Sequence, residues 1–441
     1  MELLMKNTSI NVQRSFVKKL IFFQIYYNLF IKFFIGEFNF PHSLNYITDI
    51  VTFFIVLFAL GEIKHGYQKN KVIYNWLIIM ILFTFIGFIW NIYSPLYYLW
   101  GLRNTFRFFI FFLCCAVILN KSDVQNIIKL LLKLLPLNVL LCAYQYYTLR
   151  DTGGYVSLYL GDFIGGIFGP IQGSNVPMNI YLSLILTFIF VAYTERQLSL
   201  FKLLIFSIMC FYIAILAELK FIYFEFLLIL LLLMVLSKIS FKKILSFATG
   251  VIIIVVVLNI WTMFNPDSSE LLSNTDAMIN YSANESYAGK SSVNRLSAIP
   301  TIVDVFFQYD ISKKLVGVGL GNADTSTISF LSSPMYDQYG EKLKYNFFQQ
   351  AILLLETGFV GLILYILFFI IVFINTFKVE YLSNYEYIYI VLARIFAILA
   401  ILNVFYNQSF RLESSGYLSF LMLSIPFIWK NNRNEELTEN T

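Results

Sequence analysis

Continuous apolar runs recur along most of this chain, and many of them are close to the length of a membrane-spanning helix. About 20 residues of α-helix cross the hydrocarbon core of a bilayer, which is roughly 30 Å thick. Apolar residues make up 59% of the sequence and charged residues only 13%, a balance that excludes an ordinary soluble globule. The runs are continuous rather than alternating, which excludes a transmembrane β-barrel. The sequence therefore predicts an all-α polytopic membrane protein.

About 12 transmembrane helices are expected from run length. The predicted spans cover residues 20–36, 44–60, 73–92, 99–119, 125–147, 177–194, 199–217, 220–237, 244–263, 346–375, 388–406 and 414–429. Residues 1–264 thus hold nine helices and residues 346–430 hold three. Between the ninth and tenth spans, residues 265–345 form one large polar loop, and residues 431–441 form a polar tail. The link at 148–176 is rich in glycine and is expected to turn back onto the membrane surface.

The lysines and arginines of the short links predict the orientation of the helices. With a cytoplasmic N-terminus, the basic residues of the inner links are Lys64, Lys69, Lys71, Lys121, Arg196, Lys202, Lys238, Lys242, Lys243, Lys378, Lys430 and Arg433. The short outer links at 36–43 and 91–97 carry none. An even number of spans then places both termini in the cytoplasm, and it places 148–176 and 265–345 outside.

Other kinds of site find little support in the sequence. The basic residues of this chain, whose net charge is +5, are spread over many links, which argues against nucleic-acid binding. The cysteines all fall inside apolar runs and are expected to be small buried side chains: Cys114, Cys115, Cys142 and Cys210. Neither His42 nor His65 belongs to a group with metal-ligand spacing. We expect no disulfide, no metal and no cofactor.

Two arginines lie in the outer third of the fourth predicted span. Arg103 and Arg107 are one helical turn apart and therefore share a face of the helix. Charges inside a membrane are costly, and two like charges on one face repel each other. The pair is therefore expected to share an anion.

Other charged residues occur near the predicted outer boundary of the membrane. Lys220 begins the eighth span beside Glu218, Arg411 lies near Glu413 between the last two spans, and Arg295 lies in the large loop. For Lys220 and Arg411, snorkelling to the interface is an equally good explanation. As a group, however, outward-facing arginines at this depth suit a lipid-linked diphosphate, which guanidinium groups bind in two-point contacts without a metal.

Two further features have simpler interpretations. Arg394 lies deeper, in the eleventh span, and is expected to pair inside the helix bundle or with lipid headgroups. The glycines of residues 317–321 look like a nucleotide-binding turn, but they lack the strand–turn–helix frame and the phosphate-binding lysine. We expect this segment to be a flexible turn.

Several short segments stand out between the apolar runs: Trp100-Gly-Leu-Arg-Asn-Thr-Phe-Arg107, Gly169-Pro-Ile-Gln-Gly-Ser-Asn175, Ala217-Glu-Leu-Lys220, Asn294-Arg295, Val316-Gly-Val-Gly-Leu-Gly-Asn322 and Asn346 through Gly361. Together with the topology, they resemble the bacterial O-antigen polymerase and ligase superfamily, most closely the capsular or exopolysaccharide repeat-unit polymerases of the Wzy type. Ligases and many polymerases of this superfamily carry a histidine just before the asparagine that opens the helix after the loop. Here that position is Tyr345, which favours a polymerase over a ligase.

The resemblance implies a glycosyltransferase that joins oligosaccharide repeat units carried on undecaprenyl diphosphate, at the outer face of the bacterial cytoplasmic membrane. The cations that would bind the diphosphate are Arg295 first, then Arg103, Arg107, Lys220 and Arg411. The candidates for a base that deprotonates the acceptor are Glu218, Glu413, Asp304 and Glu356, with Glu356 more simply structural. Loop aromatic residues that could stack on sugars are Tyr281, Tyr287, Tyr336 and Tyr339.

Three alternatives stay open. A repeat-unit flippase or 12-helix carrier would favour internal repeats and charges at the membrane midplane, and no repeat is visible in this sequence. A scaffold protein of an export machine would explain the large loop but not the outward-facing cations. An O-antigen-ligase-like transferase would use the same lipid-linked donor. The sequence identifies neither the sugar nor the linkage, and it leaves open whether a chain-length regulator protein acts as a partner.

Overall fold

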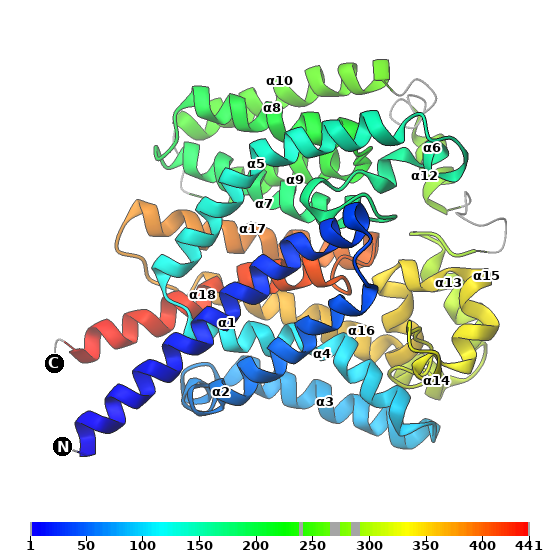
Figure 1. Ribbon diagram of the computed structural model, residues 1–441, viewed down its shortest axis with the longest axis horizontal. Helices are drawn as coiled ribbons and strands as arrows, with labels where there is room; N and C mark the ends of the chain where they lie inside the picture. The colour runs from blue at the N-terminus through cyan, green and yellow to red at the C-terminus, as the bar shows by residue number, and fades with distance from the viewer. Residues whose placement is uncertain (1, 238–240, 265–273, 284–291, 440–441) are drawn as a thin grey trace.

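The computed structural model describes residues 2–237, 241–264, 274–283 and 292–439 (Figure 1). Every regular element in these ranges is helical, which confirms the predicted all-α class. The long helices are α1 (Glu2–Phe38), α2 (Ile47–Lys69), α3 (Lys71–Asn91), α4 (Pro95–Ile118), α5 (Lys121–Leu149), α7 (Asn175–Thr194), α8 (Leu200–Leu216), α9 (Lys220–Leu236), α10 (Phe241–Phe264), α16 (Gln349–Thr376), α17 (Asn384–Tyr406) and α18 (Glu413–Glu439). Lys238 and Tyr287 lie outside the described residues.

Nine helices in this described part of the chain are long and apolar enough to cross a membrane. They belong to α1–α5, α7, α10, α16 and α17. The other three expected spans coincide with α8, α9 and α18. Of these, α8 and α9 are 17 residues long, and α18 passes from an apolar first half into a polar second half. The structure supports a multi-span membrane protein, and the count of 12 stays a prediction.

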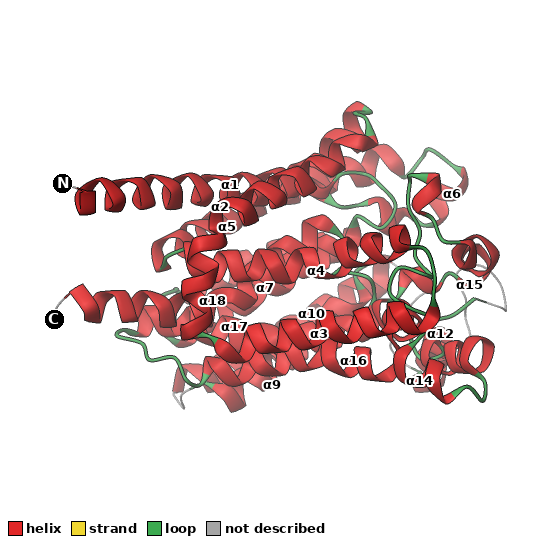
Figure 2. Cartoon of the chain, turned by 90° about the horizontal axis from the view of Figure 1, so that it is seen from below, coloured by secondary structure: helices red, strands yellow, loops and turns green. Residues whose placement is uncertain are grey.

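The axes of the long helices are broadly parallel, so the molecule has two distinct ends (Figures 1 and 2). Both termini lie at one end. The opposite end, here called the distal end, holds the short helices α6 (Gly154–Leu158), α12 (Thr275–Ala283), α13 (Ala298–Ile302), α14 (Ile311–Val316) and α15 (Glu341–Leu343). These short helices come from the two polar links that were predicted to share one side of the membrane. Their position outside a membrane stays a prediction.

Helices α4, α7 and α17 form the centre of the bundle, because most of their side chains are buried. Phe108 of α4 stacks on Phe420 of α18, with ring centroids 5.7 Å apart. Phe109 meets Phe420 and Phe368 edge to face, at 4.9 and 4.8 Å. In contrast, α2, α3 and α10 leave most of their apolar side chains exposed, as expected for helices that lipid would cover.

Local capping determines where α4 begins, and therefore where its two arginines lie. The Ser94 side chain accepts a hydrogen bond from the helix backbone, and Pro95 occupies the first helical position. Arg103 and Arg107 follow about two and three turns later, near the distal end.

The segment 317–321, here called the glycine wedge, is not the flexible turn that the sequence suggested. Two of its backbone N–H groups donate to the carbonyls of Leu355 and Glu356 in α16, at 2.9 and 3.0 Å. α16 is interrupted at this level by Gly358, whose φ is 64°. A Cβ on Gly317 would lie only 2.5 Å from the α16 backbone. The wedge is therefore fixed against an opened turn of α16.

The other side of the glycine wedge contacts α4. A Cβ on Gly101 would come within 2.5 Å of the Gly321 nitrogen, so the two backbones touch. Gly321 has a φ of 79°, and a Cβ there would overlap the Tyr97 carbonyl oxygen. Glycine is required on both sides because only a bare backbone fits between α4 and α16. The wedge thus presents the residues that follow it to α4.

Arg394 lies inside the bundle, which was one of its two expected positions. Its Nε and Nη2 atoms donate to the hydroxyl and carbonyl of Thr376, at 3.0 and 3.1 Å, and Nη1 donates to the carbonyl of Leu236 at 2.9 Å. Thr376 ends α16 and Leu236 ends α9. A cation at two helix C-termini is favourable because it faces the negative ends of both helix dipoles.

Candidate functional site

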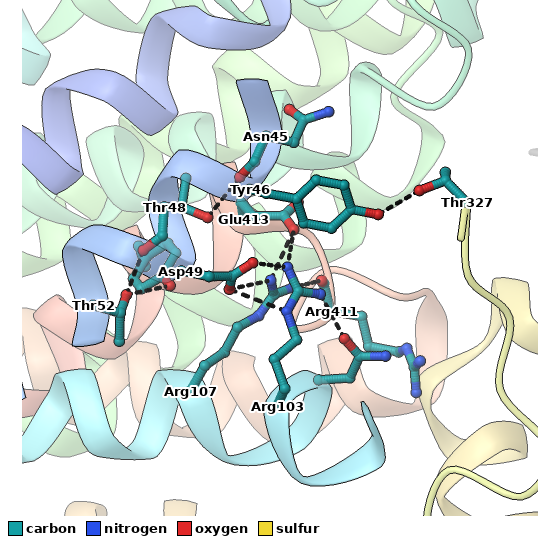
Figure 3. A network of polar contacts seen from close by, with 12 residues as sticks. Asn45, Tyr46, Thr48, Asp49, Thr52, Arg103, Arg107, Thr327, Arg411 and Glu413 are labelled. Carbon is teal, nitrogen blue, oxygen red and sulfur yellow. Dashed lines mark hydrogen bonds and ion pairs between the residues drawn. The ribbon is translucent and has the colours of Figure 1, made fainter. Parts of the chain in front are cut away.

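The two arginines of α4 lie in an ion-pair network (Figure 3). Arg103 contacts Asp49 of α2 at two points, Nε to Oδ1 at 3.0 Å and Nη2 to Oδ2 at 2.6 Å. Arg107 donates to Glu413 at 2.8 Å and to the carbonyl of Arg411 at 2.8 Å. Longer ion pairs join Arg103 to Glu413 at 3.7 Å and Arg107 to Asp49 at 3.8 Å. Each carboxylate therefore faces both guanidinium groups.

Arg411 extends this network to the residues that follow the glycine wedge. Its Nη2 atom lies 2.5 Å from Asp324 Oδ2, and the Asn104 amide donates to the same oxygen at 2.7 Å. Asn104 in turn accepts a hydrogen bond from Arg103 at 2.6 Å. Asp324 is almost fully buried. The wedge thus delivers an acid from the large loop to a pair of positive and polar groups in the bundle.

We call these residues the arginine network: Arg103, Arg107, Arg411, Asp49, Asp324 and Glu413. Its three arginines face three carboxylates, so its formal charges balance. The anion expected between Arg103 and Arg107 is supplied by the chain itself, through Asp49 and Glu413. This corrects the argument that the pair requires an external anion.

The environment of Glu413 argues against its predicted role as a base. Burial alone would raise the pKa of Glu413, but the positive charges of Arg107, Lys32 and Arg103 lower it to about 2. A carboxylate this acidic is a weak proton acceptor at neutral pH. For Arg411, burial alone would lower the pKa, but the nearby carboxyl groups raise it above its ordinary value. Both groups are therefore held in their charged forms.

A second group, here called the loop cluster, consists of Asp162, Glu218, Lys220 and Arg295. Burial raises the pKa of Asp162, whereas Asn175, Arg295 and Lys220 lower it, so both cations act on this carboxyl group. Burial also raises the pKa of Glu218; Lys220 opposes that rise and Asp162 adds to it. The cluster therefore brings together residues from the 148–176 link, the α8–α9 turn and the large loop.

Backbone geometry holds the α8–α9 turn against the 148–176 link. Glu218 has a φ of 49°, in the left-handed region that non-glycine residues rarely adopt. A Cβ on Gly161 would lie 2.6 Å from the Glu218 Cβ, so the two segments touch. On the other side, Asp162 accepts a hydrogen bond from the Asn175 amide at 2.9 Å. Such backbone strain at a polar position is a common feature of functional sites.

Arg295 is fixed at the distal ends of two long helices. Its guanidinium carbon lies 4.4 Å from the ring centroid of Tyr406, the last residue of α17. Tyr406 stacks on Phe221 at the start of α9, with centroids 3.7 Å apart. The Arg295 carbonyl accepts a hydrogen bond from Gln350 at 2.6 Å. Cation–π contact and backbone anchoring together hold this arginine at the level where the helices end.

Besides Glu413, two predicted acids lie outside the loop cluster. Asp304 is exposed, and in the described part of the chain it forms no ion pair with either group. Glu356 is buried in α16 beside the arginine network, where it accepts a hydrogen bond from the Ala323 backbone at 3.4 Å. The structure thus brings Glu218, Lys220 and Arg295 together, and it leaves Asp304 apart.

Sequence reasoning missed three acids that act with the predicted cations: Asp49 and Asp324 form ion pairs with them, and the pKa of Asp162 is lowered by Arg295 and Lys220. Asp49 carried a usable signal, since it is a lone acid inside the second predicted span at the same depth as Arg103. Asp162 and Asp324 lie in glycine-rich links, where no periodic pattern indicates which way a side chain points.

Comparison with known proteins adds no further constraint. No family model and no curated protein matches the chain. In the described ranges, no group of three or more histidine, cysteine, aspartate or glutamate residues is arranged to hold a metal ion.

Proposed function

We propose that this chain is a polysaccharide polymerase that joins oligosaccharide repeat units carried on undecaprenyl diphosphate. The observation that carries the proposal is the loop cluster, in which Lys220 and Arg295 act on one carboxyl group, that of Asp162. These residues come from three separate links and meet at the end of the bundle opposite both termini. Two cations that converge in this way suit the two phosphates of a lipid-linked diphosphate.

The depth of the cluster supports a lipid-linked substrate. Lys220 is the first residue of α9, and Tyr406 beneath Arg295 is the last residue of α17. Ends of long apolar helices lie at the level of lipid headgroups, where the diphosphate of a membrane-anchored carrier is also expected. The lysine and arginine bias of the links orients this end toward the outer face of the bacterial cytoplasmic membrane.

In the proposed reaction, the oxygen of an acceptor hydroxyl forms a bond to the anomeric carbon of the donor chain. The bond from that carbon to the diphosphate oxygen breaks, and its electron pair leaves with undecaprenyl diphosphate. Lys220 and Arg295 stabilise the charge that grows on this leaving group, which lowers the barrier more than it stabilises bound substrate. The hydroxyl proton passes to a carboxylate of the cluster.

We assign that carboxylate to Glu218. Burial raises the pKa of Glu218 above its ordinary value, which strengthens it as a base. Asp162 is assigned to hold Lys220 and Arg295 in position between turnovers, because both cations act on its carboxyl group. In this scheme, the arginine network is a positioning element: Arg103, Arg107 and Arg411 tie together α2, α4, α18 and the residues that follow the wedge.

A flippase or carrier is the second candidate, and one buried acid favours it. Glu225 of α9 is fully buried and accepts hydrogen bonds from Asn179, Ser183 and Asn403. None of the recorded ion pairs of the described residues involves Glu225. Acids buried among membrane helices are typical of proton-coupled and ion-coupled transporters.

The test combines a polysaccharide gel with analysis of lipid-linked intermediates, in cells whose only copy carries Arg295→Ala. Lys314→Ala is the matched control, since Lys314 lies on α14 at the same end and belongs to neither group. Membrane levels of each variant are measured by immunoblot. We expect Arg295→Ala to abolish long chains and accumulate single repeat units on the lipid carrier at the outer face, while Lys314→Ala makes normal polymer.

Two results would overturn the assignment. Normal polymer from Arg295→Ala at wild-type protein level would remove Arg295 from the site and refute the proposed clamp. Single units that accumulate only on the cytoplasmic side would instead identify the chain as the flippase.

A further inference from the structure

The distal end also contains a cavity of about 530 Å³ that is lined by no residue of the arginine network or the loop cluster. Its walls come from two π-helical turns, η5 (Val303–Phe307) and η7 (Tyr336–Gly340), and from the residues after η5. π-Helical turns are rare and are often found at functional sites. The volume falls within the range of roughly 300–1,000 Å³ that is typical of small-ligand sites.

Aromatic rings and polar side chains share the lining of this cavity. Tyr309 stands at its rim with 96% of its surface exposed. Phe306 and Tyr339 form a wall in which the two rings meet edge to face, with centroids 5.1 Å apart. Gln308 and Gln338 contribute amide groups beside these rings.

The polar groups at the rim are held in place by the backbone. Asp310 caps α14, where it accepts hydrogen bonds from the Lys313 N–H at 3.2 Å and the Ser312 hydroxyl at 2.6 Å. Gln308 has a φ of 46°, and its N–H donates to the Val303 carbonyl at 2.7 Å. A strained residue persists only where its surroundings determine it, and such positions cluster at ligand sites. The lining is thus preorganised.

These features match the chemistry of a carbohydrate. The C–H faces of a sugar ring are apolar and pack on aromatic rings, whereas its hydroxyl groups donate to carboxylates and exchange hydrogen bonds with amides. Tyr309, Phe306 and Tyr339 offer the first kind of contact, and Gln308, Gln338 and Asp310 offer the second. The set would bind a sugar through several weak contacts, as suits a chain that must be released.

The cavity is also placed to hold a chain whose end reaches the loop cluster. Arg295 is followed by α13 (Ala298–Ile302), which continues directly into η5. Phe306 is 11 residues after Arg295, so one short helical segment connects the cavity wall to the loop cluster.

We propose that this cavity is a binding site for the growing saccharide, which holds the chain between successive additions. The identity of the saccharide rests on the polymerase function proposed above. The cavity itself is defined by its residues, and its test does not depend on catalysis.

The test measures binding by saturation-transfer difference NMR, with the full-length protein in nanodiscs. The probe is a set of oligosaccharides of one to three repeat units, released by partial acid hydrolysis from the organism's own surface polysaccharide. We expect saturation of the sugar ring protons with wild type, and binding about three- to tenfold weaker for Tyr309→Ala, the value of one aromatic contact. Gln338→Ala is a second variant, and Phe330→Ala is the matched control because Phe330 is 65% exposed in η6 (Ser329–Leu331).

The outcomes separate this site from the catalytic proposal. Arg295→Ala should bind the oligosaccharides like wild type even where it makes no polymer. In cells, Tyr309→Ala should shorten the polymer rather than abolish it. The cavity proposal is refuted if wild type shows no saturation transfer at millimolar probe, or if Tyr309→Ala and Gln338→Ala both bind as tightly as wild type. Either result leaves the Arg295 test of the polymerase unaffected.

Discussion

Replacement of Glu413 by glutamine removes one negative charge from the arginine network and leaves the side-chain shape almost unchanged. In the structure, Glu413 lies 2.8 Å from Arg107 and 3.7 Å from Arg103. The variant therefore leaves the buried Arg107 and the half-buried Arg103 with only Asp49 as a common partner. We expect it to destabilise the protein.

The size of the effect follows from two independent estimates. The pKa of Glu413 falls from its ordinary 4.5 to about 2, which corresponds to about 3 kcal/mol of favourable interaction with its neighbours. Removal of one partner from a buried ion pair generally costs about 3–5 kcal/mol. Because the Glu413 side chain is 15% exposed, the lower figure applies. We predict a loss of about 3 kcal/mol.

The assay is thermal unfolding in detergent, followed with a thiol-reactive fluorophore. The four cysteines are all buried, so they react only as the protein opens. For a chain of this length, the predicted loss corresponds to a melting temperature about 3–6 °C lower. Glu341→Gln is the matched control: Glu341 pairs with Lys344 at 2.7 Å, but its side chain is 73% exposed, so its loss costs less than about 1 kcal/mol.

A Glu413→Gln variant that melts within a degree of Glu341→Gln would contradict this prediction. In that case the network would contribute nothing to stability, and Arg103 and Arg107 would be better explained as groups held ready for an external anion.

Three further predictions use the same melting assay. The stability that Glu413 contributes is complete above its ordinary pKa and is lost as the pH falls toward about 2. The difference in melting temperature between wild type and Glu413→Gln should therefore be smaller at about pH 3 than at about pH 7. An unchanged difference contradicts this. Gly358→Ala should cost more than about 2 kcal/mol because its Cβ would lie 2.4 Å from the Leu315 backbone. Gly153→Ala, which has open space around it, should cost about 1 kcal/mol. Equal losses would refute the close contact of α16 with this backbone. Glu225→Gln keeps an oxygen acceptor and should cost under about 1 kcal/mol, whereas Glu225→Leu leaves three buried donors without a partner and should cost about 3 kcal/mol; a loss of about 3 kcal/mol from both variants would instead show that the charge itself is required.

The fold class could be predicted because apolar run length is a local property. The composition of α16 alone predicts a membrane span, whatever the helix packs against. Its expected bounds of 346–375 are close to the observed Gln349–Thr376. The break at Gly358 could not be predicted, because it depends on the backbone of residues 315–319, which lie some forty positions earlier. Sequence pattern reports what each segment prefers alone, and this break is a property of two segments together.

The arginines of the candidate site could be predicted from the sequence, but their acidic partners could not. The cost of charge in lipid singled out Arg103, Arg107 and Arg411 without any structure. Their partners were out of reach: Arg103 meets Asp49 at a separation of 54 residues, and Arg107 meets Glu413 at a separation of 306. Pairing at such separations follows from helix packing, so a charge pattern can indicate that a partner exists but not which residue it is.

The glycine wedge has a consequence for how the protein is made. Residues 317–321 are synthesised after α4 but before α16, and they contact both. The α16 side of the wedge, and the Arg411 partner of Asp324, exist only once the last helices have been translated. The distal end must therefore close late, after insertion is nearly complete. A ribosome-stalled or truncated chain that ends before Gly358 keeps Asp324 without its cation, and the cell's quality control would meet it as an unfinished protein.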